Sequence, residues 1–295
     1  MKRMNNPYRY TLRLAIDKNI YDADKKQRLI DFVKKAHISD VAFFLNQEEL
    51  SDTHITLDKA QELISDVDEI SQPLKELGIT ISLNPWTTMN HSDRGIPIKP
   101  ELDIKPMVNY QGKKSLSIAC PGYPGWADYI SNIYGIWASI HPHELWLEDD
   151  FRHYKNAPFA LGCFCDDHMK QYNEVLGTNL SREEFVAKMF TGGENKYRNA
   201  YLKVARAEIL HVAHMIEQRV HEVSPTTTLG LMSSWPAVHA LEGRDWQKLL
   251  DELSGPDTPA VSRPHLPAIT QSGRHNLAVP LSNLPWAPAP SLAEI

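Results

Sequence analysis

Three consecutive acids follow an apolar run in this sequence. The segment ELWLEDDFRHY, residues 144–154, carries Glu148, Asp149 and Asp150 where a buried strand should end. Two carboxyl groups held close together raise the pKa of one of them through repulsion and burial, and such a group can donate a proton near neutral pH. We therefore take Glu148 and Asp150 as candidate general acid/base residues. The alternative is a structural run of acids with Arg152 as its ion-pair partner.

Cysteines and a histidine form a second chemical group. Residues 163–168 read C-x-C-x-x-H, and the remaining cysteine of the three in the chain precedes a predicted helix. Three thiolates and one imidazole make a closed tetrahedral zinc site, which is structural because it leaves no position for water. The predicted ligands are Cys120, Cys163, Cys165 and His168. Asp166 or Asp167 could replace the histidine as the fourth ligand. The alternative to a metal site is three reduced cysteines that do not contact one another and a histidine on the surface.

Alternating strand and helix patterns must position these groups. The expected strands are residues 10–16, 40–45, 79–84, 144–149, 227–234 and 258–263. The expected helices are residues 22–37, 56–78, 125–141 and 245–255, with 165–222 mainly helical. Pro73 is expected to kink or split the second helix, and an irregular stretch should run from the third strand to about residue 115. Near-continuously apolar strands alternating with helices predict a parallel sheet.

This alternation predicts an α/β fold of the (β/α)8 TIM-barrel type, incomplete at about six strand–helix units. A doubly wound open sheet is the alternative, but the phosphate-binding glycine motifs that would favour it are missing. We expect residues 1–268 to form the barrel domain. Residues 269–295 form a Pro-rich tail with no strand or helix period. Either this tail wraps over the barrel or the chain stops short of a complete barrel, and we expect the second.

The bulk composition excludes several function classes. A net charge of −6 without a Lys/Arg-rich block argues against nucleic acid as the main partner. The first residues, MKRMNNPYRYTLRL, contain no apolar core of a secretory signal, and no apolar run reaches the roughly 18 residues of a membrane span. An odd number of cysteines argues for a reducing compartment. We expect a cytoplasmic protein that binds neither membrane nor nucleic acid and uses no organic cofactor.

Several residues at predicted strand ends could bind a substrate, because barrel enzymes keep their chemistry at the carboxyl ends of the strands. Strand alternation would send Glu148 and Asp150 to the same side. Two tryptophans follow the third and fifth strands, where a sugar ring could stack. The candidate substrate-binding residues are Asn84, Trp86, Asp149, Arg152, Trp235, Arg263 and His265. His91, in the loop after the third strand, has only a weak claim to a role.

Three segments resemble the family 42 β-galactosidases of the clan A glycoside hydrolases: IACPGYPGWADYISNIYGIWASI, LWLEDDFR and CFCDDHMKQYNEVLG. In that family a cysteine precedes the fourth barrel unit, whose strand ends in Asp-Asn-Glu and an aromatic residue. A C-x-C-x-x-C segment then leads into a helix, and in several members the four cysteines hold zinc. The resemblance covers roughly residues 115–178. It implies a zinc site in which His168 stands at the position of the last cysteine.

The sequence departs from this family at two positions. Asp150 stands where the family has its acid/base glutamate and Asp149 where it has asparagine. The shorter side chain retracts the proton donor by about one methylene, although carboxyl groups of retaining enzymes must lie roughly 5–5.5 Å apart. Glu148 could serve instead. The nucleophile, a glutamate ending the seventh strand, has no counterpart, since only Glu294 follows Glu252.

The resemblance implies a glycosidase acting on β-glycosides, with β-galactosides as the best expectation, by carboxylate acid/base catalysis. It also implies an oligosaccharide or glycoside partner and a homo-oligomer. One alternative is a metal-dependent sugar isomerase or epimerase, in which the acids would bind a divalent ion. The other is a non-catalytic carbohydrate-binding or truncated barrel, which would bind sugar without turnover.

Overall fold

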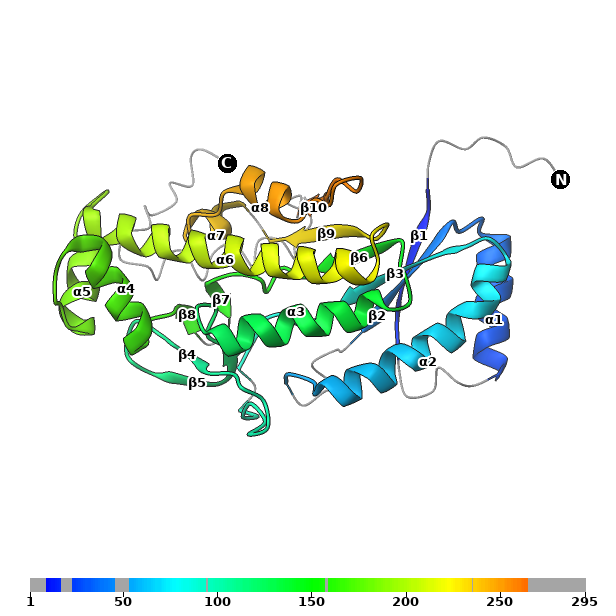
Figure 1. Cartoon of the computed structure of the whole chain (residues 1–295), viewed down its shortest axis with the longest axis horizontal. Helices are drawn as coiled ribbons and strands as arrows, with labels where there is room; N and C mark the ends of the chain where they lie inside the picture. The colour runs from blue at the N-terminus through cyan, green and yellow to red at the C-terminus, as the bar shows by residue number, and fades with distance from the viewer. Residues whose placement is uncertain are drawn as a thin grey trace, which may run out of the picture.

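The apolar runs of the sequence form one six-stranded sheet in the order β1-β2-β3-β6-β9-β10, shown in Figure 1. Every neighbouring pair is parallel, as the alternation predicted. The strands are β1 (Thr11–Ala15), β2 (Asp40–Leu45), β3 (Thr80–Pro85), β6 (Glu144–Leu147), β9 (Thr228–Ser233) and β10 (Val261–Pro264). The computed structural model describes residues 9–16, 23–45, 53–93, 95–156, 159–234 and 236–264. The predicted residues Trp235 and His265 and the tail 269–295 lie outside this part.

The helices between the strands pack in series on the outside of the sheet. They are α1 (Ala23–Lys35), α2 (Leu57–Glu76), α3 (Pro124–Ala138), α6 (Lys196–Val223), α7 (Pro236–Ala240) and α8 (Trp246–Glu252). Helix α1 contacts α2, α2 contacts α3, α3 contacts α6, and α6 contacts α8. The long helices α2, α3 and α6 therefore lie next to one another across one face in Figure 1. This outer layer follows the strand order, as in a (β/α)8 barrel.

Helix α2 continues through Pro73 as one element, so the expected split does not occur. Its side chains Ile70 and Leu74, on either side of the proline, are buried in the main core. Burial of two large apolar side chains offsets the roughly 3 kcal/mol that an interior proline costs a helix.

Two antiparallel hairpins interrupt the alternation. The first, β4 (Pro106–Val108) and β5 (Lys114–Ala119), lies within and just beyond the stretch that was predicted to be irregular. That prediction was wrong because Ser115 and Ser117 are buried while Leu116 is exposed, which inverts the usual strand pattern. The buried Ser115 hydroxyl donates to Asp93 at 2.7 Å, and this bond satisfies it. The second hairpin is β7 (Tyr154–Asn156) and β8 (Phe159–Leu161).

The predicted helical stretch after the second hairpin contains α4 (Asp166–Leu176) and α5 (Arg182–Met189) before α6. Helices α4, α5 and α6 enclose a second apolar core that includes Tyr172, Phe185 and Tyr201. Helices α4 and α5 lie at the left end of the molecule in Figure 1, where the long helix α6 begins. In the part of the chain that the structure describes, none of the helices combines the length and apolarity needed to cross a membrane.

Candidate active site and metal centre

Glu148 lies at the carboxyl edge of the sheet, bound to residues from two other strands. Its Oε1 accepts a hydrogen bond from Arg13 of β1 at 2.9 Å and from Asn84 of β3 at 3.1 Å. Arg13 Nε also donates to Asn84 Oδ1 at 2.6 Å, which closes a three-residue ring. Burial raises the pKa of Glu148, although the hydrogen bonds from Asn84 and the Asp149 backbone oppose it. Arg13 is a site residue that the sequence does not reveal, because its partners Asn84 and Glu148 lie on strands far away in the chain.

Asp149 has the opposite electrostatic environment. Its carboxylate contacts His91 Nε2 at 2.9 Å and Arg152 at 3.0 Å, and it accepts a short hydrogen bond from Ser234. Burial opposes ionisation of Asp149, but the hydrogen bond with His91 and the charge of Arg152 hold its pKa well below the usual range. Consecutive carboxyl groups are therefore pushed in opposite directions, Glu148 toward the protonated and Asp149 toward the ionised form. Such a divergence is typical of an acid/base pair.

Asp150 is completely buried and holds the loop that follows β3. Its oxygen atoms accept hydrogen bonds from the Thr88 N–H at 2.8 Å, the Thr88 hydroxyl at 2.6 Å and the Asn90 N–H at 2.8 Å. Strand β6 ends at Leu147, so the alternation that was expected to point Glu148 and Asp150 the same way does not extend to these acids. Burial raises the pKa of Asp150, against the charge of His91 and the bonds from Thr88.

An aromatic platform lies beside the acids. Trp86, half-buried at the end of β3, stacks on His91 with ring centroids 4.1 Å apart and an interplanar angle of 13°. Its other neighbour is Phe44 of β2, whose ring also lies 3.9 Å below the Arg13 guanidinium. The predicted position of Trp86 at a strand end is confirmed. His91 contacts both Trp86 and Asp149. The one feature of the sequence that indicated a role for it was its position in the loop after the third strand.

The remaining predicted binding residues lie in different environments. Arg152 is 3% exposed, and its guanidinium donates to the Tyr154 carbonyl at 2.8 Å and the Ser234 hydroxyl at 3.0 Å. It therefore faces protein atoms. Arg263 is exposed near the end of β10. Burial lowers the pKa of Arg13, while the charge of Glu148 raises it. The charge of Arg263 also lowers it, so Arg13 of β1 and Arg263 of β10 lie close enough to interact electrostatically, although these two strands are at opposite ends of the strand order.

His91, Glu148 and Asp149 also offer three ligand atoms within 4.8 Å of one another, the geometry of a divalent-cation site. Each carboxylate already faces a guanidinium group, Arg13 at 2.9 Å from Glu148 and Arg152 at 3.0 Å from Asp149. The positive charges of Arg13 and Arg152 balance the negative charges of the two carboxylates, as a bound cation would otherwise do. The arrangement therefore argues against the metal-dependent isomerase.

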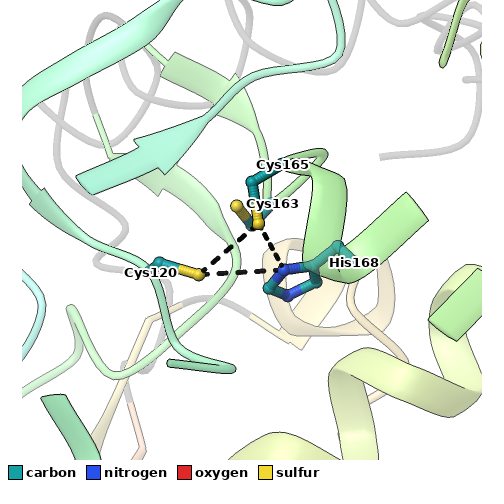
Figure 2. A group of neighbouring side chains, drawn as sticks. All are labelled: Cys120, Cys163, Cys165 and His168. Atoms are coloured by element: carbon teal, nitrogen blue, oxygen red, sulfur yellow. Dashed lines mark hydrogen bonds between the residues drawn. The ribbon is translucent and has the colours of Figure 1, made fainter. Parts of the chain in front are cut away.

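The cysteines and His168 converge on one point, as Figure 2 shows. His168 Nδ1 lies 3.2 Å from Cys165 Sγ and 3.7 Å from Cys120 Sγ. All four predicted ligand atoms lie within 4.8 Å of one another. Cys120 follows β5, the pair Cys163 and Cys165 lies between β8 and α4, and His168 occupies the first turn of α4. The spacing-based prediction of a four-residue cluster thus agrees with the geometry.

The donor set fits a closed zinc site. Hydrogen bonds with Cys120 and Cys163 lower the pKa of Cys165, whereas hydrogen bonds with Cys163 and Cys165 raise the pKa of Cys120, so the cluster favours the thiolate at Cys165 first. The alternative fourth ligands point outward, since the side chains of Asp166 and Asp167 are 102% and 64% exposed whereas that of His168 is fully buried. Three sulfur atoms and one imidazole nitrogen are the donor types of a structural Cys3His zinc site.

Comparisons with known proteins bear on the fold. No protein-family model matches the sequence, and no curated protein matches it. Among solved structures, the catalytic domain of β-amylase from Paenibacillus polymyxa matches with a TM-score of 0.58 at 12% identity, over 95% of this chain and 90% of that one. β-Galactosidase from Bacillus circulans sp. alkalophilus matches with a TM-score of 0.54 at 16% identity, over 89% of this chain and 40% of that one.

A third match is β-galactosidase from the haloarchaeon Halorubrum lacusprofundi, with a TM-score of 0.57 at 13% identity, over 83% of this chain and 39% of that one. The chain therefore spans about two fifths of the length of these β-galactosidases. At such identities the likeness concerns the fold. The six parallel strands and their outer helices share their fold with these β-amylase and β-galactosidase structures.

Proposed function

We propose that this chain is the catalytic barrel of a glycoside hydrolase that acts on β-glycosides, with Glu148 as the general acid/base. The observation that carries the proposal is the pair of adjacent acids at the carboxyl edge of the sheet, where Arg13 and Asn84 contact Glu148 and His91 and Arg152 contact Asp149; the pKa of Glu148 is raised and that of Asp149 is lowered there. A carboxyl group whose pKa is raised by burial holds its proton to a higher pH and can give it to a glycosidic oxygen, and an ionised neighbour stabilises the positive charge that develops on the sugar. β-Galactosides are the first substrates to test, because of the family resemblance.

We propose Glu148, and not Asp150, as the proton donor. Asp150 is completely buried and its carboxylate accepts three hydrogen bonds, so we assign it to the support of the loop after β3. Arg13 and Asn84 would position Glu148, and Arg152 would orient Asp149. The Trp86 ring would stack against a sugar, with His91 holding its plane. The second carboxylate that a retaining reaction requires is not assigned among the described residues.

The test is turnover of aryl and alkyl β-glycosides by the purified chain and by Glu148→Gln. Loss of a general acid should reduce kcat/KM on an alkyl galactoside by about 100-fold or more, while a dinitrophenyl galactoside, whose leaving group needs no proton, should lose far less. Glu144→Gln is a matched control, because Glu144 begins the same strand, where it accepts a bond from Trp146 at 3.0 Å. Equal losses on both substrates, or sugar binding without turnover by the unaltered chain, would contradict the proposal.

We also propose that Cys120, Cys163, Cys165 and His168 hold a structural zinc ion. Bound there, zinc would supply folding energy by joining the end of β5, the segment after β8 and the first turn of α4. The three free cysteines agree with a reducing compartment, and we propose the cytoplasm. Metal analysis of undamaged protein should find about one zinc per chain, and less than half an equivalent would contradict the site.

A further inference from the structure

We infer that Glu208 of α6 positions His168 as a metal ligand, an inference that rests on the proposed zinc site. Glu208 Oε2 lies 3.0 Å from His168 Nε2, on the side of the ring opposite the thiols. The other ring nitrogen, Nδ1, faces Cys165 and Cys120. A neutral imidazole carries one N–H and one lone pair, so a hydrogen bond from Nε2 to the carboxylate turns the lone pair of Nδ1 toward the sulfur atoms.

The position of the Glu208 carboxylate is fixed from several sides. Gln171, on the same helix as His168, donates to Glu208 Oε1 at 3.3 Å. His153 Nε2 lies 3.5 Å from Oε2, so this oxygen faces two histidines. The side chain of Glu208 is only 10% exposed. A carboxylate held in this way restricts the rotation of the His168 ring before any metal binds.

Gly122 provides the space for this contact. A Cβ atom at residue 122 would lie 2.1 Å from Glu208 Oε1 and 2.9 Å from His168 Cε1. Any larger residue would therefore have to push the carboxylate away from the ring. Gly122 follows the ligand Cys120 by two positions in the sequence, so the segment that supplies one ligand also leaves the room for Glu208 to orient another.

The same carboxylate connects the cysteine cluster to the loop that carries the acids. His153, which faces Glu208, directly follows Arg152, and Arg152 is the ion-pair partner of Asp149. The His153 N–H donates to the buried Glu242 at 2.5 Å, which fixes the backbone between the two groups. Glu208 is thus a positioning residue: it contacts His168, which would bind the metal, and touches no proposed substrate group.

The experiment measures zinc affinity by competition with a chromogenic chelator, using the full chain. Glu208→Leu should weaken zinc binding by about 10- to 100-fold, and Glu208→Gln by less, because an amide oxygen can still accept the bond. Gly122→Ala should weaken it in the same direction. Glu217→Gln is the matched control: Glu217 lies on the same helix and contacts His221 Nδ1 at 2.8 Å, and its replacement should leave zinc affinity unchanged.

The outcomes separate this inference from the proposals on which it rests. If the unaltered chain binds one zinc and folded Glu208→Leu keeps its affinity within about twofold, the inference is overturned while the zinc site stands. If the unaltered, reduced chain binds no zinc, both are overturned, and glycoside turnover is judged separately. If Glu208→Leu does not fold, NMR of the zinc-loaded unaltered chain decides: metal on Nδ1 with a proton on Nε2 supports the inference, and metal on Nε2 overturns it.

Discussion

Asp149 contacts His91 Nε2 at 2.9 Å, and this bond joins the loop after β3 to the acids after β6. The same histidine stacks on Trp86, so one imidazole contacts both the ionised carboxylate and the aromatic platform. Asp149 and His91 are 58 positions apart in the sequence. The adjacent Glu148 is held by Arg13 and Asn84.

The opposite pKa directions predict the pH profile of glycoside turnover. Activity requires protonated Glu148 and ionised Asp149, so kcat/KM should fall at alkaline pH as Glu148 loses its proton and at acidic pH as Asp149 gains one. Because the pKa of Glu148 is raised, the alkaline limb should lie above the value of about 4.3 for an ordinary glutamate. Glu148→Gln should abolish that limb. Persistence of the limb at the same pH in this variant would contradict the assignment.

Asp150→Asn should destabilise the fold. The neutral amide can turn its oxygen to the N–H groups of Thr88 and Asn90 and its NH2 to the Thr88 hydroxyl, but both backbone bonds lose their charge assistance. We therefore expect a loss of about 1–2 kcal/mol in the free energy of unfolding. Urea denaturation measures it. Asp128→Asn, on the exposed side of α3, should change stability by less than about 0.5 kcal/mol. A stable Asp150→Asn protein that fails only on alkyl glycosides would restore Asp150 as the proton donor.

Trp86→Ala should weaken substrate binding more than chemistry. Loss of a stacking surface worth about 0.5–1.5 kcal/mol predicts a KM increase of roughly 2- to 12-fold in steady-state kinetics. Trp86→Phe, which retains an aromatic plane between Phe44 and His91, should lose much less. An unchanged KM in the alanine variant would remove Trp86 from the binding site.

Zinc removal should affect stability before it affects turnover. Cys165→Ser removes one ligand and should cost about 3 kcal/mol, which corresponds to roughly 5 °C in Tm for a chain of this size. Asp166→Asn, in the adjacent exposed residue, should have no comparable effect on Tm or on zinc content. Thermal denaturation with and without chelator checks both. Immediate loss of turnover on chelation, at unchanged Tm, would instead favour a catalytic cation among the acids.

Local patterns in the sequence were sufficient to predict the parallel sheet and the cysteine cluster. Strands such as Asp40–Leu45 are buried on both faces, so their continuous apolar character marks them without knowledge of their neighbours. The C-x-C-x-x-H spacing places Cys165 and His168 within one helical turn, and their proximity is therefore a local property. The β4–β5 hairpin was missed because its buried Ser115 is satisfied by Asp93, which lies 22 positions away in the sequence.

The sequence by itself determined that three acids follow a core strand and that three thiols and an imidazole are available as ligands. Only the tertiary structure decided the environment of each acid, because the pKa and exposure of a carboxyl group depend on the hydrogen-bond donors that other segments of the chain bring to it. Asp150 accepts hydrogen bonds from the backbone of Thr88 and Asn90. Glu148 accepts hydrogen bonds from Arg13 and Asn84. The contact with His91 favours the ionised form of Asp149. The carboxylate of Glu208 reaches His168 only because the chain folds Gly122 against it, a contact that no sequence spacing encodes.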